Sequence, residues 1–108
     1  MIYLASPYSH PDPVIMQNRY ELARNYTFKE IRKGLPMFSP IVHCHDMYLN
    51  CKGAESNFNY WREYNIQMLR FSTELHILTL PGWRDSQGVA FEMFAAEERS
   101  IPTVYVNG

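Results

Sequence analysis

Residues 80–106, LPGWRDSQGVAFEMFAAEERSIPTVYV, contain a loop, a helix and a strand in succession, and this stretch decides the fold class. The segment 87–99 has the small and apolar residues of a packed helix, and the segment 101–106 is rich in strand-forming residues. An apolar run at 74–80, ELHILTL, precedes them and is typical of a buried strand. Because a helix that joins two strands normally makes a right-handed parallel crossover, this part of the chain predicts a β-α-β unit.

The N-terminal third of the chain extends the same alternation. Residues 2–6, IYLAS, predict a first strand, and residues 14–33 predict a helix because their apolar side chains fall on one helical stripe. Asp12 and Pro13 have the residue types of an N-cap and a first helical position, and Gly34 is typical of a helix C-terminus. This segment therefore predicts a strand followed by a long helix.

The middle of the chain has weaker signals. Residues 36–42, PMFSPIV, predict a short second strand bounded by prolines, and residues 43–57, HCHDMYLNCKGAESN, predict a polar connection. Residues 57–71 predict a second helix. Strands that alternate with helices predict an α/β fold, with a mostly parallel sheet of about four strands and helices on both faces.

Length and composition limit the possible functions. A chain of 108 residues, 46% of them hydrophobic, predicts a single domain over residues 1–108. The net charge of -1 argues against a polymeric nucleic acid partner and against a polybasic membrane patch. With no long apolar run and no basic region before the first apolar residues, we expect neither a membrane span nor a signal peptide. Two cysteines do not require a disulfide, so we expect a reduced, cytoplasmic protein.

The predicted topology indicates where a ligand would bind. In open parallel sheets, ligands bind beyond the carboxyl ends of the strands, where the strand order reverses. Loops at 6–11, 39–45 and 81–88 are expected to meet there, with Ser6 and Tyr8 in the first of them. The chain lacks G-x-G-x-x-G, P-loop and G-x-S-x-G motifs, so it does not support classical dinucleotide binding, P-loop hydrolysis or an α/β-hydrolase triad. We expect no cofactor.

Glu92 is the unusual residue of the opening stretch. It lies about 60° from Val89 and about 40° from Ala96 on the helical wheel, so it flanks the sheet-facing stripe, where a buried carboxylate needs a partner. A structural pairing or a route to solvent explains this position, and so does a ligand. Ser86 and Gly88 open the same helix, where free N–H groups suit an anion such as phosphate; an ordinary serine N-cap explains them equally.

The string HCHD, at 43–46, has the composition of a metal site. His43 and His45 alternate as at the end of a strand, however, and no second cluster has ligand spacing, so we expect no metal. We expect His43 to face the site from the end of the second strand. Arg19 lies on the apolar side of the first helix, where it either snorkels to solvent or points a cation at the site.

Several aromatic residues stand close to the predicted strand ends. Tyr3, Tyr8, Trp61 and Trp83 are explained as core or rim residues. Aromatic rings at such positions also suit stacking on a flat base, and Tyr8 and Trp83 are the residues that we expect to contact a ligand in this way.

Two segments resemble the nucleoside 2-deoxyribosyltransferase superfamily, which includes the nucleoside 5′-monophosphate N-glycosidases. They are IYLASPY at the start, and GW-x-x-S-x-G-V-x-x-E followed by A-x-x-x-x-x-I-P near the end. The likeness covers nearly the whole chain and is nearest to a small phage and bacterial branch with Gly-Trp before the Ser-x-Gly motif. It implies a small flavodoxin-like (Rossmann-like) three-layer sandwich, which agrees with the pattern of strands and helices.

The resemblance also implies roles for individual residues. The family nucleophile is a glutamate four residues after a motif glycine, a spacing that Gly88 and Glu92 have. Its attack on C1′ of the sugar would expel the base and leave a covalent glycosyl-enzyme. Ser86 occupies the position that helps to bind the 5′-phosphate in the hydrolases, where the transferases have an aspartate; Asp85 adjoins it here. Tyr3 matches a first-strand tyrosine near the nucleophile.

Two positions depart from the family pattern. The acid that assists the departing base corresponds to Asn65, and an asparagine cannot act as a general acid. Glu63 or Asp46 are alternatives for that role. The segment 6–12, SPYSHPD, lacks the Gly-rich, Arg-containing phosphate loop of the hydrolases.

Three functions follow as expectations from this reading. The first is cleavage of an N-glycosidic bond, or base transfer, on a (deoxy)nucleoside or nucleoside 5′-monophosphate. The second is a non-catalytic nucleotide-binding module, which Asn65 favours, and the third is a structural protein with a relict pocket. Because relatives complete their sites across dimer contacts, the resemblance also implies a homodimer or a higher homo-oligomer.

Overall fold

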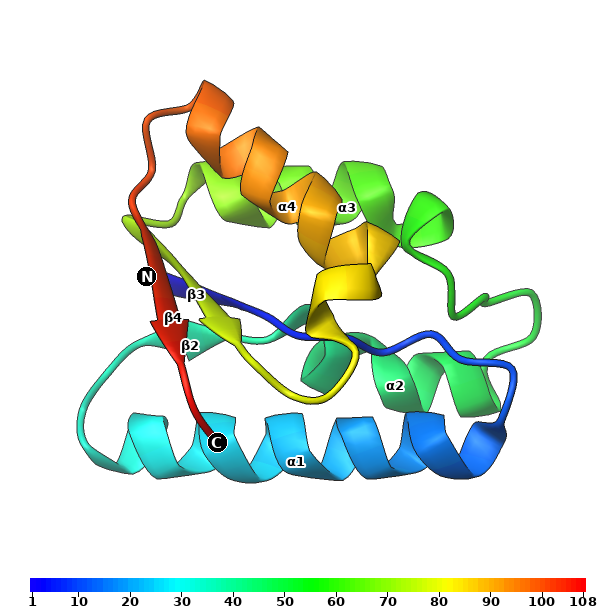
Figure 1. The fold of residues 1–108 in the computed structure, drawn as a ribbon. Coiled ribbons are helices and arrows are strands. Elements are labelled where there is room, and N and C mark those ends of the chain that lie inside the picture. The colour runs from blue at the N-terminus through cyan, green and yellow to red at the C-terminus, as the bar shows by residue number, and fades with distance from the viewer.

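A computed structural model describes residues 1–108 as a four-stranded sheet between two layers of helices (Figure 1). The elements in chain order are β1 Ile2–Ala5, α1 Pro13–Arg32, β2 Met37–Phe38, α2 Pro40–Asn50, α3 Phe58–Arg70, β3 Glu74–Leu78, the 3-10 turn η1 Trp83–Asp85, α4 Gln87–Glu98 and β4 Thr103–Val106. The strand order is β2-β1-β3-β4, and all neighbouring strands are parallel. The α/β class and the flavodoxin-like three-layer arrangement are confirmed, and the sheet is wholly parallel.

The two faces of the sheet have separate cores. Figure 1 shows α1 and α2 on one side of the sheet and α3 and α4 on the other. Along β1, Tyr3 and Ala5 belong to the core under α3 and α4, whereas Ile2 and Leu4 belong to the core on the α1 side. This alternation with a period of two residues is the reason that a continuous apolar strand covers both faces.

The termini of α1 and α4 follow directly from the sequence. The Asp12 side chain accepts a hydrogen bond from the Val14 N–H, and Pro13 is the first residue of α1. Gly34, just beyond the helix, has a φ of 92°, a conformation that favours glycine. At α4, the Ser86 hydroxyl accepts from the Val89 N–H. These three predicted helix signals are confirmed.

The prediction for residues 36–57 was wrong in one respect. The strand ends at Phe38, and α2 occupies most of the segment that the sequence predicted as a strand end and a polar connection. Ser39 caps this helix by accepting from the Val42 N–H, and Pro40 is its first residue. This pair has the same N-cap and first-position chemistry as the start of α1, and it outweighs the strand propensity of the apolar run.

None of the helices combines the length and the apolar character that crossing a membrane requires.

Candidate functional site

A cavity of about 570 Å³ opens at the carboxyl ends of β1 and β3, where the strand order reverses. Its walls come from the loop after β1, the first turns of α2, one face of α3, and the segment from Gly82 into α4. The prediction that the loops at 6–11 and 81–88 meet at one site is confirmed. The expected residues that line the cavity are Ser6, Tyr8, Arg19, Asn65, Ser86, Gly88 and Glu92.

Glu92 and Tyr3 form the central contact of the site. The Tyr3 hydroxyl, fully buried on β1, donates a hydrogen bond to Glu92 Oε2 on α4. Burial raises the pKa of Glu92 to about 8, and the hydrogen bond from Tyr3 opposes this rise. Burial, and then the charge of Glu92, raise the pKa of Tyr3 well above its ordinary value. The carboxyl therefore faces the cavity with a hydroxyl partner, and neither of the two ion pairs of the chain involves it.

The N-terminus of α4 presents unpaired hydrogen-bond donors to the same cavity. Ser86 Oγ is 3.2 Å from the Val89 nitrogen, so Ser86 is a conventional N-cap. The backbone N–H groups of Gln87 and Gly88 have no partner within the chain. The Ser6 hydroxyl, on a residue that is 6% exposed, also has no partner and also lines the cavity. Together these donors and the helix dipole suit an anion.

Arg19 connects two walls of the cavity. Its Nη1 donates to the backbone carbonyls of Tyr8 and Ser9, at 3.4 and 3.1 Å. Its Nη2 lies so close to Gly82 that a Cβ there would be 2.6 Å away, and Gly82 itself has a φ of 90°. The arginine therefore holds the loop after β1 and passes against the loop after β3. Arg19 lines the cavity, and its guanidinium is bound to the carbonyls of the loop after β1.

Two expected site residues lie elsewhere. His43 is exposed on α2, where its Nε2 is 3.0 Å from the Tyr64 hydroxyl and the two rings stack. The prediction that it faces the site was wrong because residues 39–45 begin a helix, and Ile41 and Cys44 take the cavity side. Trp83 packs beside the core and against the ring of Tyr105, 5.6 Å between centroids, so the expectation that it lines the cavity was also wrong.

Tyr8 lines the cavity, but its hydroxyl is hydrogen-bonded to a histidine of α2. It lies 2.7 Å from His45 Nδ1, and the other ring nitrogen of His45 lies 3.0 Å from Gln17 Oε1. The imidazole also stacks on Tyr20, with centroids 3.9 Å apart. His45 thus ties the loop after β1 to both α1 and α2. No group of three or more His, Cys, Asp or Glu side chains is arranged to hold a metal ion.

Comparison with family models gives a match over residues 1–107 to the family described as "Domain of unknown function (DUF1937)". The chain belongs to the DUF1937 family. Because the match spans all but the last residue, every strand and every residue of the cavity is part of the DUF1937 domain. Comparison with curated proteins found no match.

The wall that α3 contributes to the DUF1937 cavity was not among the predicted features. Besides Asn59, it consists of Phe58, Trp61, Arg62 and Asn65, of which only Asn65 was expected to act on a ligand. These four residues have the spacing i, i+3, i+4 and i+7, which places them on one face of a helix. That spacing is visible in the sequence, but its mixture of aromatic and polar residues resembles an ordinary half-buried face.

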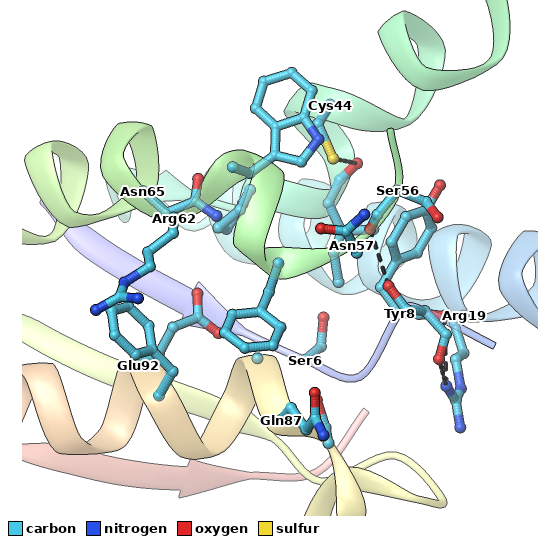
Figure 2. Close-up of a pocket in the computed structure, with 18 of the residues that line it drawn as sticks. Ser6, Tyr8, Arg19, Cys44, Ser56, Asn57, Arg62, Asn65, Gln87 and Glu92 are labelled. Atoms are coloured by element: carbon cyan, nitrogen blue, oxygen red, sulfur yellow. Dashed lines mark hydrogen bonds between the residues drawn. The ribbon is translucent and has the colours of Figure 1, made fainter. Parts of the chain in front are cut away.

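The charged groups of the cavity are few. Asp85 and Glu92 are its two carboxyl groups, and Arg19 and Arg62 are its two guanidinium groups. Figure 2 shows Glu92 on the side of the cavity where Arg62 and Asn65 extend from α3, with Gln87, Ser6 and Arg19 further along the site. The DUF1937 domain therefore combines a carboxyl held by a tyrosine, a helix N-terminus with unpaired N–H groups and an aromatic wall in one cavity.

Proposed function

We propose that the DUF1937 domain binds a nucleoside, or more favourably a nucleoside 5′-monophosphate, and cleaves its N-glycosidic bond with Glu92 as the nucleophile. The observation that carries this proposal is the Tyr3–Glu92 hydrogen bond inside a cavity whose other end has unpaired N–H groups. Because Tyr3 engages Oε2, the Oε1 atom of Glu92 remains available to attack a ligand. The resemblance to the deoxyribosyltransferase superfamily assigns the same role to this glutamate.

The spacing of the two ends fits a nucleotide. Glu92 follows Gly88 by four residues, so it lies about 6 Å further along the helix axis at about 1.5 Å per residue. A phosphate on the N–H groups of Gln87 and Gly88 would place the sugar beside the Glu92 carboxyl. The volume of the cavity, about 570 Å³, lies within the usual range for small-molecule sites, roughly 300–1,000 Å³.

The reaction has two displacements. Glu92 Oε1 bonds to C1′ of the sugar while the C1′–N bond breaks and its electron pair passes to the base. Water, or a second base, then attacks C1′ and releases the carboxylate. Tyr3 keeps the carboxyl oriented in both steps, and its hydrogen bond favours the ionised form that the first step needs.

The test is release of free base. Wild-type protein is incubated with the common ribo- and deoxyribonucleoside 5′-monophosphates and with the corresponding nucleosides, and the products are separated by chromatography. Glu92→Gln should lower the rate by several orders of magnitude, since an amide cannot replace the nucleophile, while the fold is kept because the two side chains have similar volumes. Base release that is unchanged in Glu92→Gln would refute the assignment. A second, labelled free base in the reaction separates transfer from hydrolysis.

The phosphate preference has a matched variant of its own. Ser86→Asp keeps an N-cap of comparable strength, so the fold should be retained, but it places a negative charge at the expected phosphate position. Binding of 5′-monophosphates should weaken by about 10-fold or more, and binding of nucleosides should not. Equal effects on both ligands would remove the phosphate from the proposal.

A nucleotide-binding module without catalysis is the second candidate. It is favoured by Asn65, which lines the cavity without a group that can protonate a base, and by the pKa of about 8 for Glu92, which keeps much of this carboxyl neutral near pH 7. Calorimetric binding of a nucleotide without release of its base would support this candidate over the enzyme.

A further inference from the structure

The α3 wall of the cavity has two side chains that are free to bind a ligand. Arg62 and Asn65 are three residues apart on α3 and line the cavity together. Neither side chain forms a hydrogen bond or an ion pair within the chain. The Arg62 guanidinium lies 4.8 Å from the ring centroid of Phe91, so this ring helps to hold the cation at the cavity (Figure 2).

No acid stands on this wall. Apart from Glu92, the only carboxyl group that lines the cavity is Asp85, in η1 beside the N-terminus of α4. The Tyr8 hydroxyl is bonded to His45 and the Cys44 thiol to the Ile41 carbonyl. His10 belongs to the loop after β1, where its Nδ1 accepts from the Asp12 N–H. The α3 wall thus offers N–H donors and one positive charge, and no proton donor of acidic strength.

These donors are matched to a particular leaving group. In the first displacement, the electron pair of the broken C1′–N bond stays on the base unless a proton arrives with it. A base that departs without a proton carries a negative charge, which is most stable when two ring carbonyl groups share it. Cationic and neutral donors aimed at such oxygens stabilise charge that develops only in the transition state.

We infer that the base of the natural substrate is a dioxopyrimidine, of the uracil or thymine type, that departs as an anion bound by Arg62 and Asn65. This inference rests on the proposed function and names the substrate class of the same cavity. Glu92 Oε1 forms the bond to C1′, the C1′–N1 bond breaks, and N1 keeps the electron pair. The water that later attacks C1′ supplies the proton that neutralises the base, so atoms and charge balance over the two steps.

The first experiment compares bases. Rates of base release are measured for the 5′-monophosphates of uridine and thymidine against those of adenosine and cytidine. Uracil and thymine should be released at least about 10²-fold faster, because amino-substituted bases require the protonation that this wall does not provide. Comparable rates for adenine or cytosine would overturn the inference and leave the proposed function standing. Absence of release from every nucleotide would overturn both.

The second experiment uses the acidity of the leaving group. Arg62→Gln should slow uracil release by about 10²–10³-fold, the usual effect of removing one donor to developing charge, and Arg62→Lys should restore part of the rate. The ratio of the release rate of 5-fluorouracil, the more stable anion, to that of uracil should be larger in Arg62→Gln than in the wild type. A merely structural role for Arg62 would leave that ratio unchanged, and this result would overturn the inference. His10→Asn is the control, and a drop in uracil release as large as that of Arg62→Gln would identify His10 as an acid and also overturn it.

Asn65→Asp is an independent test, because it should change the release rates of two bases in opposite directions. The added carboxyl should slow release of uracil, because its charge repels the departing anion, and should speed release of adenine, because it can supply a proton. Since the two substrates respond in opposite directions, a loss of fold cannot imitate this result. An equal change for both bases would contradict the inferred role of the α3 wall.

Discussion

Replacement of Glu92 by glutamine should stabilise the protein at alkaline pH and leave its stability unchanged in acid. The unfolded chain titrates this carboxyl near 4.5, whereas burial raises its pKa to about 8 in the folded protein. Below about pH 4 both states hold the proton, so the carboxyl imposes no cost. Between the two pKa values only the folded state holds it, and the free energy of unfolding falls as the pH rises.

The size of the effect follows from the same pKa values. At about 1.4 kcal/mol per pKa unit, the difference between 4.5 and about 8 corresponds to a loss of about 5 kcal/mol once the folded carboxyl is ionised. Because the group lines an open cavity, water reduces this cost, and we expect Glu92→Gln to be more stable than wild type by about 2–5 kcal/mol near pH 9. The amide can still accept the hydrogen bond from Tyr3, so that contact does not distinguish the two proteins.

Urea unfolding followed by tryptophan fluorescence, from about pH 4 to about pH 9, measures the difference. Glu97→Gln is the matched control, since Glu97 is exposed on the same helix, and its difference from wild type should stay within about 0.5 kcal/mol throughout. A difference between wild type and Glu92→Gln that does not change with pH would refute the reasoning. So would a variant that is less stable than wild type near pH 9.

Three further outcomes are expected. If Glu92 is the nucleophile, kcat/KM for base release should rise with pH and level off above about 8, where the carboxyl is ionised; a fall over this range would contradict that role. Tyr3→Phe should move this rise to higher pH, because the hydrogen bond from Tyr3 lowers the pKa of Glu92 and its loss raises that pKa; an unshifted pH–rate profile would argue against this role of Tyr3. Tyr8→Phe should cost about 1–3 kcal/mol of stability by leaving His45 Nδ1 buried and unpaired, as urea unfolding would show against the exposed control Tyr60→Phe.

The elements that the sequence predicted best have their boundaries fixed by local chemistry. The Asp12–Pro13 pair and Gly34 act within a few residues of themselves, so the limits of α1 could be read directly. Ser39 and Pro40 carry the same start signal, but two prolines flanking a short apolar run also suit a strand, and α2 was missed for that reason. The misplacement of His43 followed from this one error, because a helix turns successive side chains by about 100° and a strand by about 180°.

The contacts of the site depend on information that is not local. Tyr3 and Glu92 are 89 residues apart, and they meet only because β1 lies next to β3 and α4 packs over β1. The alternation of strands and helices predicts a parallel sheet but leaves the strand order open, so their contact could be expected only from resemblance. The α3 wall was missed for a different reason, since Phe58, Trp61, Arg62 and Asn65 have the composition of an ordinary half-buried helix face.

The charge that the proposed reaction requires is also the charge that weakens the fold. An ionised Glu92 is the nucleophile, yet the buried site favours its neutral form, and the Tyr3 hydroxyl is the only side-chain partner that opposes this preference. A stronger partner, such as a lysine or an arginine, would lower the pKa of the carboxyl further but would also hold its electrons and weaken its attack. A neutral hydroxyl orients the carboxyl and leaves Oε1 free of any partner in the chain. Because Arg62 on the α3 wall forms no ion pair with Glu92, its charge is available to the departing base.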